Sequence, residues 1–363
     1  MTAGFDWRES HVSYGQTGNS YTEAIQVADP VLFTLNRPMA DKPGRIFNYN
    51  TGSTDLLSVI LEKATGQSTY EYAKTKLLDP IGIKESYWGQ YRSGHFLGGA
   101  GLFLKPVDMA RIGYLFLNDG VWDGNQIISK DWVKESTKTH VKSNMFSGRD
   151  YGYLWWMNNN DGFSASGSGG QTINVLPHQN MVVVTTGSTT DSNLPTQLLD
   201  QFILPSLSSE SLQKESTAFW ALQDALNTES TPVIPQPVEI PSFAKDISGK
   251  RYVFENGSLS YTFHFQENKG GIVTIEYDGV KRTRNFGFNG NYMVYFDPSE
   301  ITITNSTLAT ATFDNNTINL QFKSLQYHTD SLLTFAFDHD KVKLKSTNLY
   351  DKSVSEVEGK LAP

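Results

Sequence analysis

Two stretches of this sequence combine residue types that could support chemistry. In PGRIFNYNTGSTDLLSVILEKATG, residues 43–66, a tyrosine stands on a turn immediately before a predicted helix, and a phenol both donates and accepts hydrogen bonds. In SASGSGGQTINVLP, residues 164–177, small residues along a strand edge would let a substrate approach the backbone closely. Taken alone, these patterns favour simpler interpretations, namely a loop aromatic and a glycine bulge.

Metal and nucleotide chemistry have little support in the residue pattern. The chain has no cysteine, which removes disulfides, thiolate zinc sites, iron–sulfur clusters and cysteine nucleophiles. Its seven histidines form neither H-x-x-x-H nor H-E-x-x-H. No G-x-x-x-x-G-K-[ST] loop is present, and GSGGQ at 167–171 lies between strand-like segments rather than ahead of a helix. We therefore expect no metal and no cofactor.

Helical periodicity surrounds the tyrosine stretch. Residues 53–65 predict a buried helix, because their apolar side chains recur on one face. The residues of that face are Leu56, Leu57, Ile60, Leu61 and Ala64. Ser68 and Glu71 form a capping box that opens a second helix. Two more helices are predicted over 107–118 and 129–138.

The pattern changes to strands after residue 150. Residues 151–157, 172–176 and 181–186 are rich in β-branched and aromatic side chains. The run Val182–Val184 predicts a strand that is covered on both faces, and a helix over 194–205 returns onto the sheet. The sequence therefore predicts a mixed α/β domain of the α+β kind over residues 1–205.

The composition changes near residue 205. Residues 206–242 are Ser-rich, then helical, then Pro-rich, which predicts a linker. From 243 to 363, alternating strands and short turns predict an all-β accessory domain, a barrel or a sandwich. Carbohydrate binding by its aromatics stays open, although a core role for them is favoured. These aromatics are Tyr252, Tyr261, Tyr292 and Tyr295.

Charge and hydropathy limit the partners. The formal charge is −8, from 30 basic and 38 acidic side chains, which argues against nucleic acid or an anionic membrane as the main partner. No apolar run reaches the length of about 18 residues that a membrane span requires. The first ten residues, MTAGFDWRES, have neither the basic n-region nor the apolar h-region of an export signal.

Six segments, in this order, resemble the penicillin-recognising serine hydrolases, and within them the class C β-lactamase-like esterases and amidases, including 6-aminohexanoate-dimer hydrolase-like proteins. The segments are MTAGFDW (1–7), KPGRIFNYNTGSTDLLSVILEKATG (42–66), LLDPIGI (77–83), GGAGLFLKPVDMARIGYLFLNDGVWDGNQIIS (98–129), YGYLWW (151–156) and SGSGGQTINVLP (166–177). The resemblance covers about residues 1–205. It implies a partial β-lactamase/transpeptidase-like domain and a small-molecule amide or ester substrate. It also implies an extracytoplasmic location, which no pattern in the residues themselves indicates.

The resemblance also implies three catalytic motifs. The second, Y-x-N, corresponds to Tyr49, Asn50 and Thr51, so that Tyr49 would shuttle protons, its phenol pKa lowered by a neighbouring cation, and Thr51 would face the substrate. The third, K-T-G, corresponds to Ala165-Ser166-Gly167 or one residue removed. Ser166, Gly167 and Ser168 would then line the substrate, and a backbone N–H near Ser168 would form half of an oxyanion hole. The motif's lysine is absent, which favours a neutral substrate.

The first motif, S-x-x-K, would supply the nucleophile and its lysine base. In the family it precedes a segment like Met1–Gly4, so we expect it upstream, and with it an N-terminally incomplete domain that exposes apolar surface and an unpaired sheet edge. A complementing N-terminal segment would then be a partner. Ser211 to Lys214 and Ser242 to Lys245 match S-x-x-K literally, but both follow the third motif, and chance explains them better.

Two functions therefore stay open. The first is a β-lactamase-related serine hydrolase that cleaves an amide or ester through an acyl-enzyme and is inactive as this chain alone, because the nucleophile segment is absent. The second is a non-catalytic remnant or binding module, carried by the C-terminal β domain.

Overall fold

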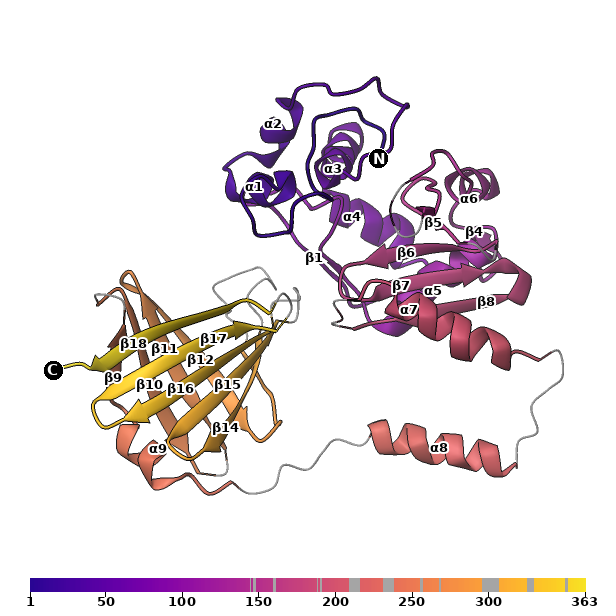
Figure 1. The fold of residues 1–363 in the computed structure, drawn as a ribbon. Helices are drawn as coiled ribbons and strands as arrows, with labels where there is room; N and C mark the ends of the chain where they lie inside the picture. Colours follow the sequence, from indigo (N-terminus) through magenta and orange to yellow (C-terminus); the bar gives the residue numbers. More distant parts are fainter. Residues whose placement is uncertain are drawn as a thin grey trace. The chain divides into compact units, whose positions relative to one another are not determined.

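The structure, a computed structural model, describes residues 1–143, 145, 148–158, 161–187, 189, 191–208, 216–230, 238–254, 257–267, 269–295, 307–324, 330–349 and 352–363, with the backbone alone at 228–230, 294–295, 307 and 324. The chain divides into two compact units, Met1–Pro195 and Thr196–Pro363 (Figure 1). The predicted boundaries at 205 and 242 stay a prediction, and Ser211 to Lys214 lie outside the described residues.

The helices of the first unit follow the local signals of the sequence. Asn50 caps α3 by accepting a hydrogen bond from the Ser53 N–H, and Gly66 ends this helix in the left-handed region at φ 70°. Ser68 and Glu71 form the predicted capping box. The helices are α1 (Ser20–Gln26), α2 (Pro30–Leu35), α3 (Thr51–Thr65), α4 (Thr69–Ala73), which continues as a π-helical turn over Lys74–Leu78, α5 (Pro106–Leu117) and α6 (Lys130–Ser136).

A four-stranded antiparallel sheet forms the other half of the first unit. Its order is β5 (Trp156–Met157), β6 (Phe163–Gly167), β7 (Gln171–Leu176) and β8 (Met181–Thr185). The predicted strand over 151–157 shortens to β5, because Leu154 takes a positive φ of 66° that ends the extended run. Two short hairpins pair β1 (Tyr87–Trp88) with β2 (Leu102–Phe103) and β3 (Val121–Trp122) with β4 (Asn125–Gln126).

The expected burial of α3 is wrong, because its polar face is the buried one. Leu57 and Ile60 are 55% and 60% exposed. The residues that α3 buries are Thr51, Gly52, Thr54, Asp55 and Ser58. These polar side chains find hydrogen-bond partners inside the unit, so burying them does not leave unpaired groups.

The strand β8 also differs from the expectation. It is half-buried along its whole length and ends the sheet order, with no strand on its outer side among the described residues. Val182 and Val184 pack against apolar side chains of α5, so α5 covers one face of the sheet. The continuous apolar run therefore marks an edge strand with one well-covered face rather than a strand that is covered on both faces.

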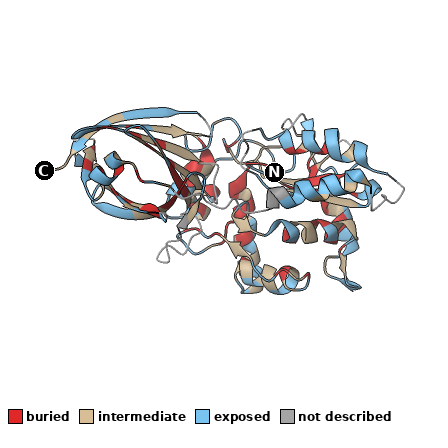
Figure 2. Cartoon of the chain, turned by 90° about the horizontal axis from the view of Figure 1, so that it is seen from below, coloured by how far each residue is buried: buried red, intermediate tan, exposed pale blue. Residues whose placement is uncertain are grey.

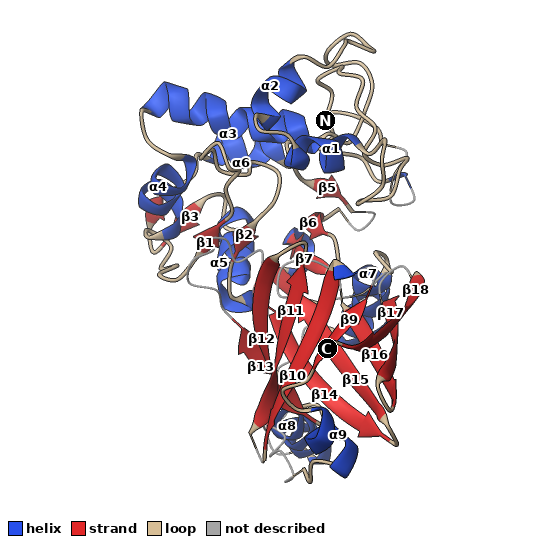
Figure 3. Ribbon diagram, turned by 90° about the vertical axis from the view of Figure 1, so that its left-hand side faces the viewer, coloured by secondary structure: helices blue, strands red, loops and turns tan. Residues whose placement is uncertain are grey.

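The second unit is a barrel, which decides between the two predicted β architectures. Nine strands close through a parallel pairing of β12 with β14 and an antiparallel pairing of β18 with β9, and β13 pairs with β14 (Figure 3). In Figure 2 the strands form a ring with exposed residues along its outer surface. The strands are β9 (Arg251–Phe254), β10 (Leu259–Gln266), β11 (Gly270–Tyr277), β12 (Val280–Phe288), β13 (Met293–Tyr295), β14 (Thr307–Asp314), β15 (Thr317–Ser324), β16 (Ser331–Asp338), β17 (Lys341–Asn348) and β18 (Val354–Leu361).

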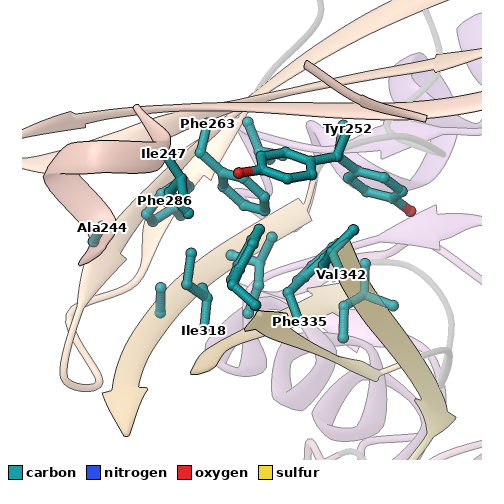
Figure 4. Packing of buried hydrophobic residues seen from close by; sticks show 14 of the residues in the cluster. Ala244, Ile247, Tyr252, Phe263, Phe286, Ile318, Phe335 and Val342 are labelled. Atoms are coloured by element: carbon teal, nitrogen blue, oxygen red, sulfur yellow. The ribbon is translucent and has the colours of Figure 1, made fainter. Parts of the chain in front are cut away.

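Aromatic side chains fill the barrel (Figure 4). The rings of Phe263 and Phe335 lie edge to face with centroids 5.0 Å apart. Tyr252 and Tyr261 are 2% and 7% exposed, which confirms a core role for these two. Tyr292 donates a hydrogen bond to Gln321, and the side chain of Tyr295 lies outside the described residues.

The helices of the second unit lie near its start. The predicted 194–205 helix is formed by α7 (Leu194–Leu198), which begins at the end of the first unit, a π-helical turn over Leu199–Ile203 and a 3-10 turn over Leu204–Ser206. They are followed by α8 (Thr217–Ser230) and α9 (Ser242–Ile247). Ala244 and Ile247 of α9 belong to the barrel core, so this helix covers one end of the barrel. No helix within the described ranges is both long and apolar enough to cross a membrane.

Candidate active site

The face of the sheet opposite α5 carries Ser166 of the predicted third motif. Phe163 and Ala165 of β6 point to the side of α5, where they join the apolar cluster with Ile173 and Val175. Because neighbouring residues of a strand alternate between faces, the other side carries hydroxyl and amide groups. The polar face includes Trp156, Ser164, Ser166, Thr172, Asn174 and Thr185, with the apolar Val183 opposite Asn174.

Hydrogen bonds order the inner part of the polar face. The hydroxyls of Thr172 and Thr185 lie 2.7 Å apart on neighbouring strands, and the Asn174 amide donates to Thr172 at 2.9 Å. The strand β5 pairs only with Phe163 and Ser164. Within the described part of the chain, the outer backbone edge of residues 165–167 is therefore left without a strand partner.

Tyr49 reaches this face through an aromatic contact. Its ring stacks on Trp156 with centroids 6.3 Å apart and planes 11° from parallel. Trp156 lies opposite Ser164 in the β5–β6 register, one same-face step from Ser166. Tyr151 meets Trp156 edge to face at 4.5 Å, and Phe47 contacts both rings. We call Phe47, Tyr49, Tyr151 and Trp156 the aromatic cluster.

The electrostatic environment of Tyr49 is opposite to the sequence-based expectation. Burial, followed by the negative charge of Glu9, raises the pKa of Tyr49 to about 12. The sequence analysis expected a cation to lower this pKa, but the ion that acts on Tyr49 here is an anion that lies 40 positions earlier in the chain. Tyr49 is therefore a protonated phenol at neutral pH in this structure.

Glu9 fixes the helix that follows Tyr49. Its buried carboxylate accepts hydrogen bonds from the Thr51 N–H at 2.8 Å and the Thr51 hydroxyl at 2.5 Å. The Trp7 indole N–H and the Tyr14 hydroxyl donate to the same carboxylate at 2.7 and 2.9 Å. A carboxylate at a helix N-terminus also faces the positive end of the helix dipole.

The placement of Thr51 follows from this contact. Thr51 is 6% exposed and gives its hydroxyl proton to Glu9. Its contribution to substrate binding stays a prediction, while its observed contact anchors the first turn of α3.

A second buried carboxylate, Asp55, holds a glycine loop against α3. It accepts hydrogen bonds from the N–H groups of Gly98 and Gly99 at 2.7 and 3.0 Å and from the Tyr91 hydroxyl at 2.5 Å. A Cβ atom at Gly98 would lie 2.2 Å from the Thr54 carbonyl oxygen, so only glycine permits this approach. Burial raises the pKa of Asp55 to about 6, although the three hydrogen bonds act in the opposite direction.

The remaining predicted residues lie at the end of β6. Ser166 is half-buried on the polar face, and Gly167 and Ser168 are exposed where the strand turns toward β7. Arg149 brings a positive charge to this region, since its guanidinium contacts Asn158 at 3.2 Å and Ser164 at 3.4 Å and lies over Trp156. The structure thus places Tyr49 against Trp156, Ser166 two residues along β6 from the partner of Trp156, and Thr51 in the Glu9 contact.

The one described S-x-x-K match has a structural role. Ser242 to Lys245 form most of α9, whose Ala244 is fully buried in the barrel core. Lys245 pairs with Glu267 at 3.1 Å. No group of three or more His, Asp or Glu side chains in the described ranges is arranged to hold a metal ion.

Several residues of this site were missed by sequence reasoning. Glu9, Asp55, Arg149 and Trp156 lie on loops, on an apparently apolar helix and on a two-residue strand. One signal could have indicated Asp55. It is an acidic residue within a helix that was expected to be buried, and a buried acid requires hydrogen-bond or ion-pair partners. Glu9 stands two residues after the first matched segment and carried no pattern of its own.

Comparison with known proteins shows the family of the first unit. Residues 1–205, more than half of the chain, match the Beta-lactamase family. The chain therefore belongs to the beta-lactamase family, whose members share a serine-hydrolase fold, and its first unit is the part that carries this membership.

Individual relatives are more distant. A 6-aminohexanoate-dimer hydrolase from Paenarthrobacter ureafaciens is 26% identical over 156 residues, which are 40% of this chain and 40% of that protein. The solved structure of a candidate 6-aminohexanoate-dimer hydrolase from Bacillus anthracis is 22% identical and has a TM-score of 0.45, covering 64% of this chain and 61% of that one. The chain thus spans about two fifths of the curated relative that it matches.

A further solved structure is similar to about a third of the chain. A fatty-acid-binding protein isolated from Manduca sexta is 13% identical and has a TM-score of 0.25, covering 31% of this chain and 98% of that one. This likeness concerns the fold alone.

Proposed function

We propose that the first unit carries the proton-transfer and substrate-binding part of a serine hydrolase that cleaves a small-molecule amide or ester through an acyl-enzyme. The observation that supports this most directly is the stacking of Tyr49 on Trp156, because Trp156 pairs with Ser164 on the strand that also carries Ser166. Family membership supports the reaction class, and the substrate belongs to the proposal.

The proposed roles follow from the geometry. Tyr49 would relay the proton that leaves the nucleophilic serine to the leaving group. The exposed turn at Gly167 and Ser168 would offer backbone N–H groups to the developing oxyanion, because small residues let the substrate carbonyl come close. Ser166 would orient the substrate from the polar face.

The nucleophile and its base would come from a Ser-x-x-Lys segment that complements this chain. Two features support a complementing segment: the outer edge of β8 and the apolar face of α3, where Leu57 and Ile60 are exposed. The electrostatics give an independent reason. With Glu9 as its neighbour, Tyr49 holds its proton at neutral pH, and the ammonium group of the motif's lysine would lower that pKa again.

A non-catalytic role for the chain is the competing proposal. It is favoured by the barrel, whose described strands close into a ring around a single core of buried residues. Under this proposal the first unit would be a remnant, and addition of a Ser-x-x-Lys segment would create no reactive serine.

Labelling with a fluorophosphonate separates the two proposals. We expect no labelling of this chain alone and labelling of a version that is extended upstream through a Ser-x-x-Lys segment. In the extended version, Tyr49→Phe is expected to slow acylation by about 100-fold or more. Tyr114→Phe, a matched change on an exposed tyrosine of α5, is expected to leave the rate unchanged. Absence of labelling in every version would favour the non-catalytic role.

A further inference from the structure

The inner face of the barrel carries two arginines, both on β12. The β11–β12 register places Arg282 opposite Ile275. It also places Arg284 opposite Val273, which is fully buried in the barrel core. Residues directly opposite one another on antiparallel strands share a face of the sheet, and Phe286, two residues further along β12, also belongs to the core. Arg282 and Arg284, which we call the arginine pair, therefore occupy inner positions.

The arginine pair is the exception on this face. Around the described part of the ring, every other inner position of the strand register holds an apolar, glycine, hydroxyl or amide residue. Charges on neighbouring strands occupy the outer face, where Glu276 pairs with Arg251 at 3.4 Å and Lys343 pairs with Glu356 at 2.6 Å. Charge toward a barrel interior is costly unless it is solvated or paired, so two successive inner arginines point to a function.

The arginine pair lies toward the end of the barrel that is remote from α9. Phe243 of α9 contacts Phe313, with ring centroids 6.1 Å apart, and Phe313 contacts Phe288 at the last position of β12 at 5.4 Å. Arg282 stands near the other end of that strand, about 20 Å from Phe288 along the extended backbone. We call this remote end, from Arg282 to the β11–β12 turn, the arginine end.

The arginine end is accessible among the described residues. Arg282 is exposed and Arg284 is half-buried, while Tyr277 and Val280, which pair with each other at inner positions, are 54% and 58% exposed. The strand β12 pairs with β14 only through its last two residues, so no described strand borders its first part on that side. The Arg284 guanidinium donates to the Thr283 carbonyl oxygen at 3.2 Å, and Arg282 forms no ion pair with a described carboxylate.

Cations beside exposed apolar side chains suit an amphiphilic anion. Successive side chains on one face of a strand start about 7 Å apart, which lets two long arginine side chains reach one anion. Each guanidinium presents a planar fork of N–H donors that matches phosphate oxygens. A phosphate monoester carries about −1.5 to −2 charges at pH 7 and accepts several strong hydrogen bonds, whereas a carboxylate carries a single charge. The arginine pair therefore matches a phosphate better than a carboxylate.

We propose that the arginine end of the barrel binds an alkyl phosphate monoester. The arginine pair holds the phosphate, and Tyr277 and Val280 contact the alkyl chain. Because aromatic side chains fill the core toward α9, the chain lies along this end rather than through the barrel. The proposal gives the second unit a ligand of its own, and it does not depend on acyl transfer in the first unit.

Isothermal titration calorimetry of the full chain with octyl phosphate, below its micelle concentration, tests the proposal. We expect octyl phosphate to bind at least about tenfold more tightly than each of three comparison compounds, which corresponds to about 1.4 kcal/mol. Octanoate replaces the phosphate, octyl glucoside removes the charge and inorganic phosphate removes the chain. Equal binding of octanoate would reject the phosphate head, equal binding of octyl glucoside would reject the role of charge, and equal binding of inorganic phosphate would reject the amphiphile.

Variants assign the binding to the arginine pair. Arg282→Gln/Arg284→Gln is expected to weaken octyl phosphate binding at least about tenfold. Lys281→Gln/Lys345→Gln removes the same charge from exposed outer positions of β12 and β17 and is expected to preserve the affinity. Hydrogen exchange of barrel peptides without ligand checks that both double variants keep the fold. Unchanged binding in the arginine variant, or equal weakening in both, would overturn the proposal.

A further variant tests the apolar contact without altering the half-buried Arg284. Val280→Ser changes an exposed inner side chain and is expected to weaken octyl phosphate binding at least about threefold, because the alkyl chain loses apolar contact. Val354→Ser makes the same change at an outer position of β18 that is 52% exposed, and it should leave the affinity as it is. An affinity that Val280→Ser does not change would refute the placement of the chain.

Discussion

Among the described residues, the core of the barrel is a single cluster of nineteen buried residues, whereas the first unit has two separate clusters of four and further buried apolar residues, such as Trp7 and Tyr151, outside both. Within the described residues the barrel closes on itself, because each of the nine ring strands pairs with two neighbours, although β12 and β14 pair only at Gly287–Thr310 and Phe288–Ala311. The sheet of the first unit ends at β8, and α3 turns apolar residues outward.

This difference shows which interactions specify the structure of each unit. Side-chain packing specifies the barrel, while the first unit depends on two buried carboxylates, Glu9 and Asp55, that tie α3 to distant loops. Such contacts hold a tyrosine in a defined position, but each of them also keeps a charge away from water. The unit that carries the candidate site is therefore expected to be the one that responds to pH, to loss of single hydrogen bonds and to added chain.

The largest effect is expected in the barrel core. Phe263→Ala removes a ring that is 1% exposed and in contact with several others, and such changes cost about 3–5 kcal/mol. Hydrogen exchange measured by mass spectrometry should show this loss in barrel peptides and none in peptides of the first unit. Phe202→Ala, at a residue that is 63% exposed, is the matched control. An equal loss in both units would show that they unfold as one.

A comparable effect is expected from the titration of Asp55. Burial raises its pKa from 3.8 to about 6, so between these values the unfolded chain loses the proton while the native state still keeps it. The stability of the first unit should therefore fall as the pH rises from 4 to above 6, by about 3 kcal/mol at about 1.4 kcal/mol per pKa unit.

The comparison with Asp55→Asn isolates this titration. Asparagine keeps an acceptor for Gly98 and Gly99 but does not ionise, so the stability difference between the native chain and the variant should change by that amount across the window. Urea unfolding followed by tryptophan fluorescence reports on the first unit, since six of the seven tryptophans lie there. Asp123→Asn, at an exposed turn, should show no such change. A difference that stays constant with pH would contradict the assignment.

A smaller effect is expected at Glu9. Glu9→Gln replaces one acceptor oxygen with an amide that faces hydrogen-bond donors, and the unit should lose about 1–3 kcal/mol. Because the charge of Glu9 raises the pKa of Tyr49, that pKa should also fall. The absorbance of the Glu9→Gln variant at 295 nm is titrated with pH, and the same titration of Glu9→Gln/Tyr49→Phe is subtracted. The midpoint of the remaining curve is the pKa of Tyr49 in the variant. Glu85→Gln, at an exposed acid, should change neither property, and an unaltered Tyr49 midpoint in Glu9→Gln would refute the coupling.

The sequence predicts the local features of both units and misses the long-range ones. Asn50, Gly66 and the Ser68–Glu71 box act within a few residues of themselves, so the extent of α3 and the start of α4 could be predicted. Strand alternation likewise predicts the barrel strands. Which face of α3 is buried depends instead on Glu9 and on Gly98, each more than 40 positions from its partner.

The candidate site shows the same limit. Tyr49 and Ser166 were found through motifs, but the tryptophan on which Tyr49 stacks, Trp156, lies in the matched segment YGYLWW without having been given a role. The direction of the Tyr49 pKa was wrong for this reason, since the ion that acts on it belongs to a loop without a recognisable pattern. Periodicity records what lies along one element, whereas the chemistry of a site is decided by neighbours that are distant in the chain.

The smallest effect on this chain is expected on the exposed face of α3. Leu57→Gln/Ile60→Gln keeps good helix formers at two exposed positions, so the stability of the first unit should stay within about 0.5 kcal/mol. Unlike the stability of the first unit, its affinity for a Ser-x-x-Lys segment should change strongly in this double variant. If the segment covers this face, loss of two buried aliphatic side chains weakens its binding by at least about 100-fold.

Titration of the segment against fluorophosphonate labelling measures this change. Val107→Gln/Tyr114→Gln makes the same kind of change on the exposed side of α5 and should leave the titration as it is. Equal weakening by both double variants would mean that the segment senses general surface polarity, and no weakening by either would mean that the face of α3 stays open to solvent in the complete site. A selective response of α3 would show that the first unit, unlike the barrel, needs another segment to complete its packing.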